Sequence, residues 1–450
     1  MALIEGYSSN SDPSDSEVER NATSKQNKDT SINHASGNKR FHFTKSELKK
    51  RKRQRALDSP WGSWSEDDSD NDETSRVNES DIRTESHHTE LESDTNSDEQ
   101  DIETEEKSSL YIEEHDYYNN SSILKPPFDV DIVFDKAPMT FKTYLPKSVK
   151  HVFDGHKNGT TQLRFIPRSG HLFLSGGNDN CIRIWDFYHE RKCLRDYQGH
   201  SKAINSLDFT TDGSNFVSSS FDKTVKLWGT ESGIVTKRVK CNSLPTSCQF
   251  RPNDPNEFIV GLSDSRILHY DVRVAEKDGL VQTYDHHNNG ILDLKYFPDG
   301  SKFISSSEDK SVRIWNSGVN IPIKQISDTT QHSMPVLEIH PNNKYFCAQS
   351  MNNTICTFDM KPKYKRIPAK TFSGQKSVGY SIGFDFSPDG HYVCSGDIRS
   401  KIVLWDWRTT KQLKEISLPG KSPISEVKWH PQETSKLICS GPSGKIYMLD

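Results

Sequence analysis

One short pattern recurs through the last two-thirds of the chain and limits the folds that it can adopt. A strand-like apolar segment ends in a large apolar or aromatic residue, usually followed by Asp, and successive copies lie 42 to 47 residues apart. The seven copies are Trp185-Asp186, Trp228-Gly229, Tyr270-Asp271, Trp315-Asn316, Phe358-Asp359, Trp405-Asp406 and Leu449-Asp450. A constant period of this length indicates an array of small units that bury their apolar faces against one another.

Each copy carries further features at nearly fixed distances. A turn position lies six residues before each anchor, at Asp179, Asp222, Asp264, Asp309, Asn352, Arg399 and Ser443. A Gly-His or Asp-His step precedes three of these turns, with the His at position 156, 200 or 286. Asp-Gly turns such as Asp212-Gly213 separate segments of alternating apolar residues. This arrangement predicts repeated strand–turn–strand units.

The pattern over residues 151–450 resembles WD40 repeats. Seven copies imply an all-β fold, a seven-bladed β-propeller of four-stranded blades. In each blade a His, a strand hydroxyl, the turn Asp and the Trp can form a buried hydrogen-bonded network. The predicted structural networks are His156, Asp179 and Trp185; His200, Asp222 and Trp228; and His286, Asp309 and Trp315.

The other four repeats depart from this set. In the sixth, Gln375 and Arg399 replace the His and the Asp, and in the seventh, Ser443 and Leu449 replace the Asp and the Trp. We expect these blades to rely on packing or on a bound partner.

Closing the ring needs one more strand, because the seventh repeat ends at Asp450. We expect residues 145–153 to form the outer strand of the last blade and so to remove an open edge. The predicted propeller then covers residues 143–450. Residues 1–142 are predicted to form a long, mostly disordered N-terminal arm.

The composition of the arm supports this division. Residues 1–109 contain only 20 apolar residues, too few to offset a backbone entropy cost of ~1–2 kcal/mol per ordered residue. Charge is also segregated: residues 39–55 hold nine bases and one acid, whereas residues 56–135 hold 25 acids and four bases. Residues 151–450 hold 38 bases and 31 acids, so the net charge of −5 describes no single surface.

The arm carries two short candidate sites. The basic run consists of Lys49, Lys50, Arg51, Lys52, Arg53 and Arg55, and it suits nuclear import or contact with RNA phosphates, the alternative being a solvated charged helix. The segment 58–64 contains Trp61 and Trp64 in a polar stretch with no core to join. This segment is predicted to be a docking peptide, the alternative being incidental exposed aromatic residues.

Other classes of function find little support. The eight cysteines form no Cys-x-x-Cys pair, which indicates free thiols in a reducing compartment. No run is long and apolar enough for a membrane span, and no secretory signal is visible. Because the repeat histidines are better explained as blade networks, we expect no catalytic residue, no metal, no cofactor and no small-molecule substrate.

Finer matches point to one family. The segments 191–195, 199–203, 405–411 and 429–436 are similar to those of the pre-mRNA-processing factor seventeen family, also called the cell-division-cycle forty homologue, and the chain resembles a fungal member. The resemblance implies a nuclear, non-enzymatic scaffold that acts in pre-mRNA splicing at the second catalytic step, exon ligation. The implied partners are spliceosomal proteins and small nuclear ribonucleoproteins, and direct contact with pre-mRNA or small nuclear RNA stays open.

Two alternatives belong to other classes. Tyr270-Asp271-Val272-Arg273 and Trp405-Asp406-Trp407-Arg408 end their blades in the type of motif by which substrate receptors of cullin-RING ubiquitin ligases bind their adaptor. Arg273 and Arg408 are therefore possible adaptor contacts. The third hypothesis is a signalling or chromatin scaffold that binds peptides at the central channel.

Overall fold

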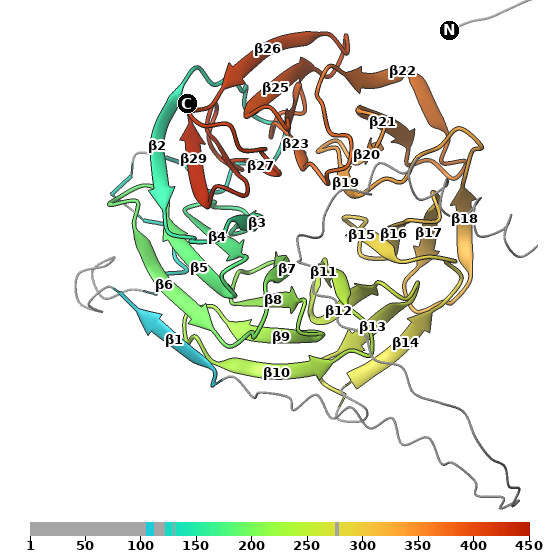
Figure 1. Cartoon of the computed structure of the whole chain (residues 1–450), viewed down its shortest axis with the longest axis horizontal. Helices are drawn as coiled ribbons and strands as arrows, with labels where there is room; N and C mark the ends of the chain where they lie inside the picture. The colour runs from blue at the N-terminus through green and yellow to red at the C-terminus, as the bar shows by residue number, and fades with distance from the viewer. Residues whose placement is uncertain (1–104, 112–121, 128, 131, 275–278) are drawn as a thin grey trace, which may run out of the picture. The chain divides into compact units, whose positions relative to one another are not determined.

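The structure is a computed structural model that describes residues 105–111, 122–127, 129–130, 132–274 and 279–450. These residues form seven antiparallel sheets arranged around a central axis (Figure 1). The prediction of an all-β, seven-bladed propeller is confirmed. Six blades have four strands, and the first has five because the strand β1 (Lys107–Leu110) joins it.

We number the blades in chain order, and each has an innermost, a second, a third and an outer strand (Figure 1). The innermost strands are β3 (Thr160–Phe165), β7 (Ile204–Phe209), β11 (Pro245–Arg251), β15 (Ile291–Tyr296), β19 (Val336–Ile339), β23 (Phe384–Phe386) and β27 (Glu426–Trp429). The second strands are β4 (Leu172–Gly177), β8 (Asn215–Ser220), β12 (Asp254–Leu262), β16 (Lys302–Ser307), β20 (Tyr345–Ser350), β24 (Tyr392–Gly396) and β28 (Leu437–Ser440).

The third strands carry the repeated anchors, and the outer strands form the rim. The third strands are β5 (Cys181–Asp186), β9 (Thr224–Gly229), β13 (Ile267–Asp271), β17 (Val312–Asn316), β21 (Thr354–Asp359), β25 (Lys401–Asp406) and β29 (Lys445–Leu449). The outer strands are β6 (Cys193–Gln198), β10 (Val235–Lys240), β14 (Leu280–Tyr284), β18 (Pro322–Ile326), β22 (Arg366–Ser373), β26 (Gln412–Ser417) and, for blade 7, β2 (Val149–Asp154).

The hydrophobic core lies between successive blades. One cluster joins Leu174 and Ile184 of blade 1 to Leu207 and Phe216 of blade 2, and similar clusters follow around the ring. Second strands are therefore covered on both faces, and every residue of β4 is buried. Outer strands such as β10 instead alternate between exposed and less exposed residues. Second strands thus bury small polar residues, such as Ser218 of β8, together with apolar ones, whereas outer strands also carry exposed polar side chains.

The ring is closed by a strand from the N-terminal side of the repeats. β2 pairs antiparallel with β29, so that Val152 lies opposite Tyr447 and Phe153 opposite Ile446. Phe153 is buried against Phe173 and Trp185 of blade 1. Because blade 7 takes strands from both ends of the repeat region, an edge strand between the first and last repeats is paired rather than left open.

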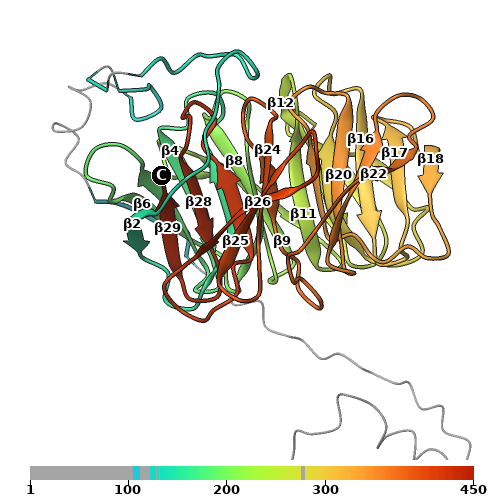
Figure 2. The same ribbon diagram turned by 90° about the horizontal axis from the view of Figure 1, so that it is seen from above.

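The predicted extent of the arm needs correction. Residues 1–104 lie outside the described residues, but residues 105–111 and much of 122–142 are described and contact the propeller. Lys107–Leu110 pairs antiparallel with β6, which places a fifth strand on blade 1. Further along, Lys136 and Gln432 exchange two hydrogen bonds, and the buried Thr143 donates its N–H to Asp389. Figure 2 shows the teal part of this segment running over one face of the ring, beyond the ends of the strands. Polar contacts to distant turns hold much of it, and two apolar contacts add to them: Leu124 packs against the core between blades 1 and 2, and Phe134 against Tyr188.

All eight cysteines lie within the propeller as free thiols. Six are buried, and Cys181 and Cys193 are half-buried. Burial raises the pKa of Cys193 to about 12, so its thiolate is scarcely populated near neutral pH and the thiol is unreactive. No helix in the described part of the chain has the length and apolar character needed to cross a membrane.

Candidate functional site

Blade 2 shows how the repeated residues work together. His200 on the loop before β7 places its Nδ1 2.8 Å from Asp222 Oδ2 and its Nε2 2.8 Å from Ser218 Oγ. The indole N–H of Trp228 donates to the same Ser218 Oγ over 2.9 Å. Blade 1 repeats the arrangement with His156, Ser175, Asp179 and Trp185. The network ties the loop, the second strand, the turn and the third strand of one blade together.

The hydrogen bonds assign the protons in this network. Because Trp228 donates to Ser218, the serine hydroxyl can donate to His200 Nε2, and the ring then carries its own proton on Nδ1, facing Asp222. Burial lowers the pKa of His200, so the ring is neutral at physiological pH. Burial opposes ionisation of Asp222, but hydrogen bonds from His200 and Thr224 outweigh it and hold the pKa of this carboxyl below its usual range. The group is thus built for structure.

In blade 4 the histidine is His287 and not His286, which corrects the sequence prediction. His287 Nδ1 lies 2.9 Å from Asp309 Oδ2, its Nε2 lies 2.7 Å from Ser305 Oγ, and Trp315 donates to that hydroxyl over 2.8 Å. His286 is exposed and donates to the carbonyl of Asn320. It stands where blades 1 and 2 have Gly. Both His-to-Asp spacings, 22 and 23 residues, occur in the other networked blades, so distance along the chain could not choose between the two histidines.

The blade 1 glycine shows why the preceding residue matters. A Cβ on Gly155 would lie 2.3 Å from the Trp185 ring, closer than any real side chain approaches. The loop therefore crosses directly over the anchor Trp. In blade 4 the corresponding ring of His286 is instead tilted beside Trp315, with ring centroids 5.9 Å apart.

A ring of polar residues on the innermost strands was not predicted from the sequence. Asp208, Asp293 and Asp385 each accept a backbone N–H from the innermost strand of the next blade, with N–O distances of 2.8 to 2.9 Å. Gln249 does the same for Tyr296. Burial raises the pKa of all three aspartates. These bonds join successive blades at the centre of the ring.

Ion pairs accompany these contacts. Arg164 on β3 pairs with Glu426 on β27 at 3.2 Å, and Glu338 on β19 pairs with Lys295 at 3.0 Å and with Lys428. Burial opposes ionisation of Glu338, but the neighbouring Lys295 and Lys428 outweigh it and lower its pKa. The side chains belong to blades 1, 4, 5 and 7, so the charges of the channel wall largely neutralise one another.

Two further histidines, each directly after an innermost strand, join neighbouring blades. His340 Nε2 donates to the carbonyl of Gly390 in blade 6, and His430 Nε2 donates to that of Gly170 in blade 1. In both rings Nδ1 accepts a backbone N–H two residues ahead. Burial lowers the pKa of His340 to about 4. Pro follows each of these two histidines in the sequence. This repeated His-Pro step is the sequence feature from which the two contacts could have been predicted.

The arm is anchored over blade 2 by Glu106. Its carboxylate pairs with Lys226 at 2.7 Å and with Arg238 at 2.6 Å. Partial burial opposes ionisation of Glu106, but the hydrogen bonds from Arg238 and Lys226 lower its pKa overall. On blade 1, Ser108 accepts a hydrogen bond from Arg195 and Tyr111 donates to Asp196. The arm thus contacts two blades through charged and polar side chains.

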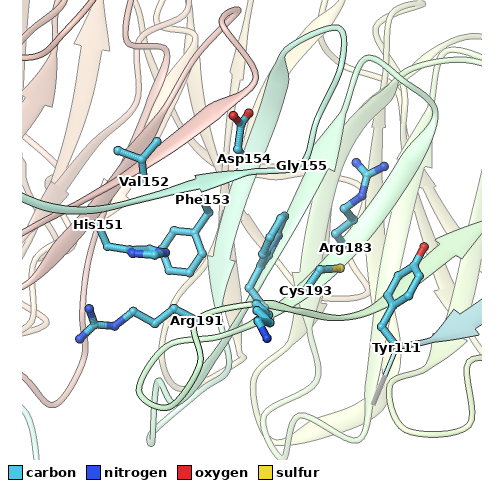
Figure 3. Close-up of a pocket in the computed structure, with 11 residues that line it drawn as sticks. Tyr111, His151, Val152, Phe153, Asp154, Gly155, Arg183, Arg191 and Cys193 are labelled. Atoms are coloured by element: carbon cyan, nitrogen blue, oxygen red, sulfur yellow. The ribbon is translucent and has the colours of Figure 1, made fainter. Parts of the chain in front are cut away.

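A pocket of about 380 Å³ lies at the seam where the ring closes. Figure 3 shows His151, Val152 and Phe153 of β2 on one wall, with Arg183 and Tyr111 across from them. Apolar rings line its floor, and Arg183, Arg191 and Lys192 supply positive charge. The described residues contain no cluster of His, Cys, Asp and Glu able to hold a metal ion. The pocket thus combines apolar rings with positively charged side chains.

The remaining candidate residues fall in two places. Lys49, Lys50, Arg51, Lys52, Arg53, Arg55, Trp61 and Trp64 lie outside the described residues. Arg273 follows β13 on the surface and pairs with Asp271 at 2.8 Å and with Asp254 at 3.1 Å. Arg408 follows β25 and is exposed. The two arginines belong to blades 3 and 6, so the structure does not bring them together.

The fold and its networks define the class of protein. Residues 147–186, 191–229, 279–316 and 366–406 match the model of the WD domain, G-beta repeat. The β-propeller domain of Cps50 (Swd1) from Myceliophteria thermophila has the same fold, with a TM-score of 0.60 and 17% identity over 68% of this chain and 99% of that domain. The protein is a WD40-repeat β-propeller.

Relatives of known name then give the family. The chain is 52% identical to Pre-mRNA-processing factor 17 of Saccharomyces cerevisiae, and the alignment covers all of both chains. It is 38% identical to Pre-mRNA-processing factor 17 of Homo sapiens over 77% of this chain, a match that spans 59% of the human protein. The chain belongs to the pre-mRNA-processing factor 17 family.

Proposed function

We propose that this protein is a non-enzymatic scaffold of the spliceosome that acts at the second catalytic step, exon ligation. The single observation that carries the proposal is the 52% identity to the Saccharomyces cerevisiae factor, which extends over the whole chain, arm included. A match confined to the repeats would support only the fold, because propellers serve many unrelated functions. Acting in splicing places the protein in the nucleus.

The geometry supports docking rather than catalysis. Networks within blades and polar contacts between blades hold the ring in one shape, and the described part of the arm adds a strand and a polar anchor to it. A rigid ring has several faces on which partners can bind at once. We propose that its partners are spliceosomal proteins and small nuclear ribonucleoproteins, and that the segment before the ring contacts further ones. A long segment that orders on binding covers a large surface at modest net affinity.

The second-step role is tested in a splicing extract depleted of this protein. We expect cleaved first exon and lariat intermediate to accumulate, and added full-length protein to restore exon ligation. Branching should proceed as in the undepleted extract. Normal exon ligation after complete depletion contradicts the second-step role.

The role of the basic run and the docking peptide is tested by deleting residues 45–64. Deletion of residues 76–95 removes the same number of residues and is the matched control. We expect the first deletion to reduce both nuclear accumulation and recovery with spliceosomes, and the control to reduce neither. If the two deletions behave alike, residues 45–64 are not a docking or import segment.

A further inference from the structure

A second pocket, of about 570 Å³, lies between blades 4 and 5 on the outer side of the ring. Its walls are the outer strand β18 and the hairpin that joins β21 to β22. Four of the nine lining residues are cationic, Lys324, Lys363, Lys365 and Arg366, and none is acidic. This pocket, which we call the basic pocket, contains none of the residues considered above.

The four cations of the basic pocket are not held in ion pairs with any described residue. All four are exposed, and within the part of the chain that the structure describes none has a carboxylate partner within 4.0 Å. By contrast, the exposed Arg238 and Arg273 are held by acidic partners. Two acids lie four residues from a lysine of the pocket, and both bond elsewhere: Asp359 accepts the backbone N–H of Lys361, and Asp328 accepts the hydroxyl of Thr329. The positive charge of the basic pocket is thus not neutralised by its surroundings.

The hairpin that carries three of these cations is held in place. Tyr364 is buried, with 3% of its surface exposed, and packs near Phe297 of blade 4. Its backbone has a positive φ of 44° and donates to the carbonyl of Lys361 over 2.7 Å. The N–H of Asp359 donates to the carbonyl of Lys365, which closes the hairpin. Because the loop is ordered before binding, little conformational entropy is lost when a ligand arrives.

We propose that the basic pocket binds the phosphodiester backbone of single-stranded RNA. Lysine ammonium groups and the planar arginine guanidinium are the usual partners of phosphate oxygens. The lining has no exposed aromatic side chain on which a base could stack, because its one tyrosine is buried. Binding therefore depends on charge and not on base sequence.

An acidic peptide is the competing ligand. Peptide interfaces draw most of their affinity from buried aromatic or apolar anchors. The basic pocket offers only the half-buried Ile326 and the exposed Pro362 for such contacts, which favours RNA. The inference rests on the proposed function only for the source of the RNA, since binding itself is a property of the surface.

The test uses the full-length protein and a fluorescein-labelled 20-nucleotide oligouridylate, with affinity measured by anisotropy between 50 and 300 mM salt. The variant Lys363→Gln/Lys365→Gln removes two phosphate contacts. We expect it to reduce the slope of log affinity against log salt by about 1.4 and to weaken binding about 25-fold at 0.1 M salt. The control, Lys202→Gln/Lys421→Gln, removes the same charge from exposed positions outside the pocket and should change the slope by less than half as much.

Three results overturn the inference. The pocket variant can bind RNA like the unaltered protein; it can weaken no more than the control, which indicates only a general charge effect; or it can keep RNA binding while losing binding of a labelled 20-residue oligoglutamate, which indicates an acidic protein partner. An unchanged thermal midpoint establishes that the variant is folded. Because purified components are used, failure here leaves the splicing proposal standing, and normal exon ligation in depleted extract leaves RNA binding standing.

Discussion

Blades 2 and 6 reach the same shape by different means. Trp228 and Trp405 are both fully buried at the same place in their blades. In blade 2 the indole N–H donates to Ser218 Oγ, whereas in blade 6 it donates to the backbone carbonyl of Ser373. Ser218 and Ser395 occupy equivalent positions, each paired with the residue two before the Trp. The blade fold therefore depends on apolar packing, and the side-chain network is an addition to it.

The difference has a consequence for polar groups. In blade 2 every member of the network has a partner. In blade 6 both amide atoms of the buried Gln375 side chain have no hydrogen-bond partner among the described protein groups. The backbone N–H of Lys376, which follows Gln375 in the chain, donates to the carboxylate of Asp397. Asp397 lies two residues before the turn position Arg399. We infer that blade 2 gains stability from its polar residues and that blade 6 does not.

The largest contrast is expected from removing the two equivalent serine hydroxyls. Ser218→Ala leaves the N–H of Trp228 and Nε2 of His200 unpaired, and we expect the free energy of unfolding to fall by about 2–3 kcal/mol. Ser395→Ala removes only weak bonds to backbone carbonyls of 3.2 Å and longer, so about 0–1 kcal/mol is expected. Urea unfolding of both variants measures this. Equal losses would show that the network adds nothing.

Acid should weaken blade 2 more than blade 6. The pKa of His200 is lowered by burial, so its contribution to stability is present above the unfolded pKa of about 6.5 and is lost as the pH falls below it. Between pH 7.5 and 5.0 we expect the unaltered protein to lose more stability than His200→Gln, which gives blade 2 the side chain of blade 6. Parallel stability–pH curves would contradict a buried neutral His200.

Replacing the unpaired amide should stabilise blade 6. Gln375→Met keeps the length of the side chain and removes two buried polar atoms, and we expect a gain of about 1 kcal/mol. His200→Met at the corresponding position of blade 2 should destabilise the protein, because Asp222 and Ser218 lose their partner. Thermal unfolding of the two variants measures whether each substitution raises or lowers the stability of the protein. If Gln375→Met lowers the free energy of unfolding, the Gln375 amide stabilises blade 6, which contradicts this account.

The smallest effect is expected at the contact of Glu106 with blade 2. Glu106→Gln breaks the ion pairs with Lys226 and Arg238, one of which is largely exposed, so we expect about 0.5–1 kcal/mol. Hydrogen exchange of Lys107–Leu110 should speed up, while exchange in β26 of blade 6 stays unchanged. If Lys107–Leu110 exchanges as before, Glu106 does not anchor the arm.

The sequence predicted the features that repeat. The seven anchors gave the number of blades, because one large apolar residue per blade must be buried in the same place. It misplaced the blade 4 histidine, since two adjacent histidines satisfy the same spacing and only the backbone position over Trp315 decides between them. The repeats themselves therefore carried nearly all of the predictable fold.

Features that join distant parts were not predictable. β1 is held to β6 by contacts between residues 85 or more positions apart, such as Tyr111 with Asp196, and its four residues have no apolar alternation. The bonds of Asp208, Asp293 and Asp385 to neighbouring blades become visible only when the ring is closed. The basic pocket likewise combines Lys324 of one blade with residues 362–366 of the next.

The central claim is that this ring works by docking within the spliceosome. Its most direct test is to purify the full-length, tagged protein from nuclei and sequence the RNA that accompanies it. The account predicts small nuclear RNAs together with spliceosomal proteins. Recovery of a cullin-ligase adaptor, or of peptide-bearing chromatin partners, without any small nuclear RNA would contradict it.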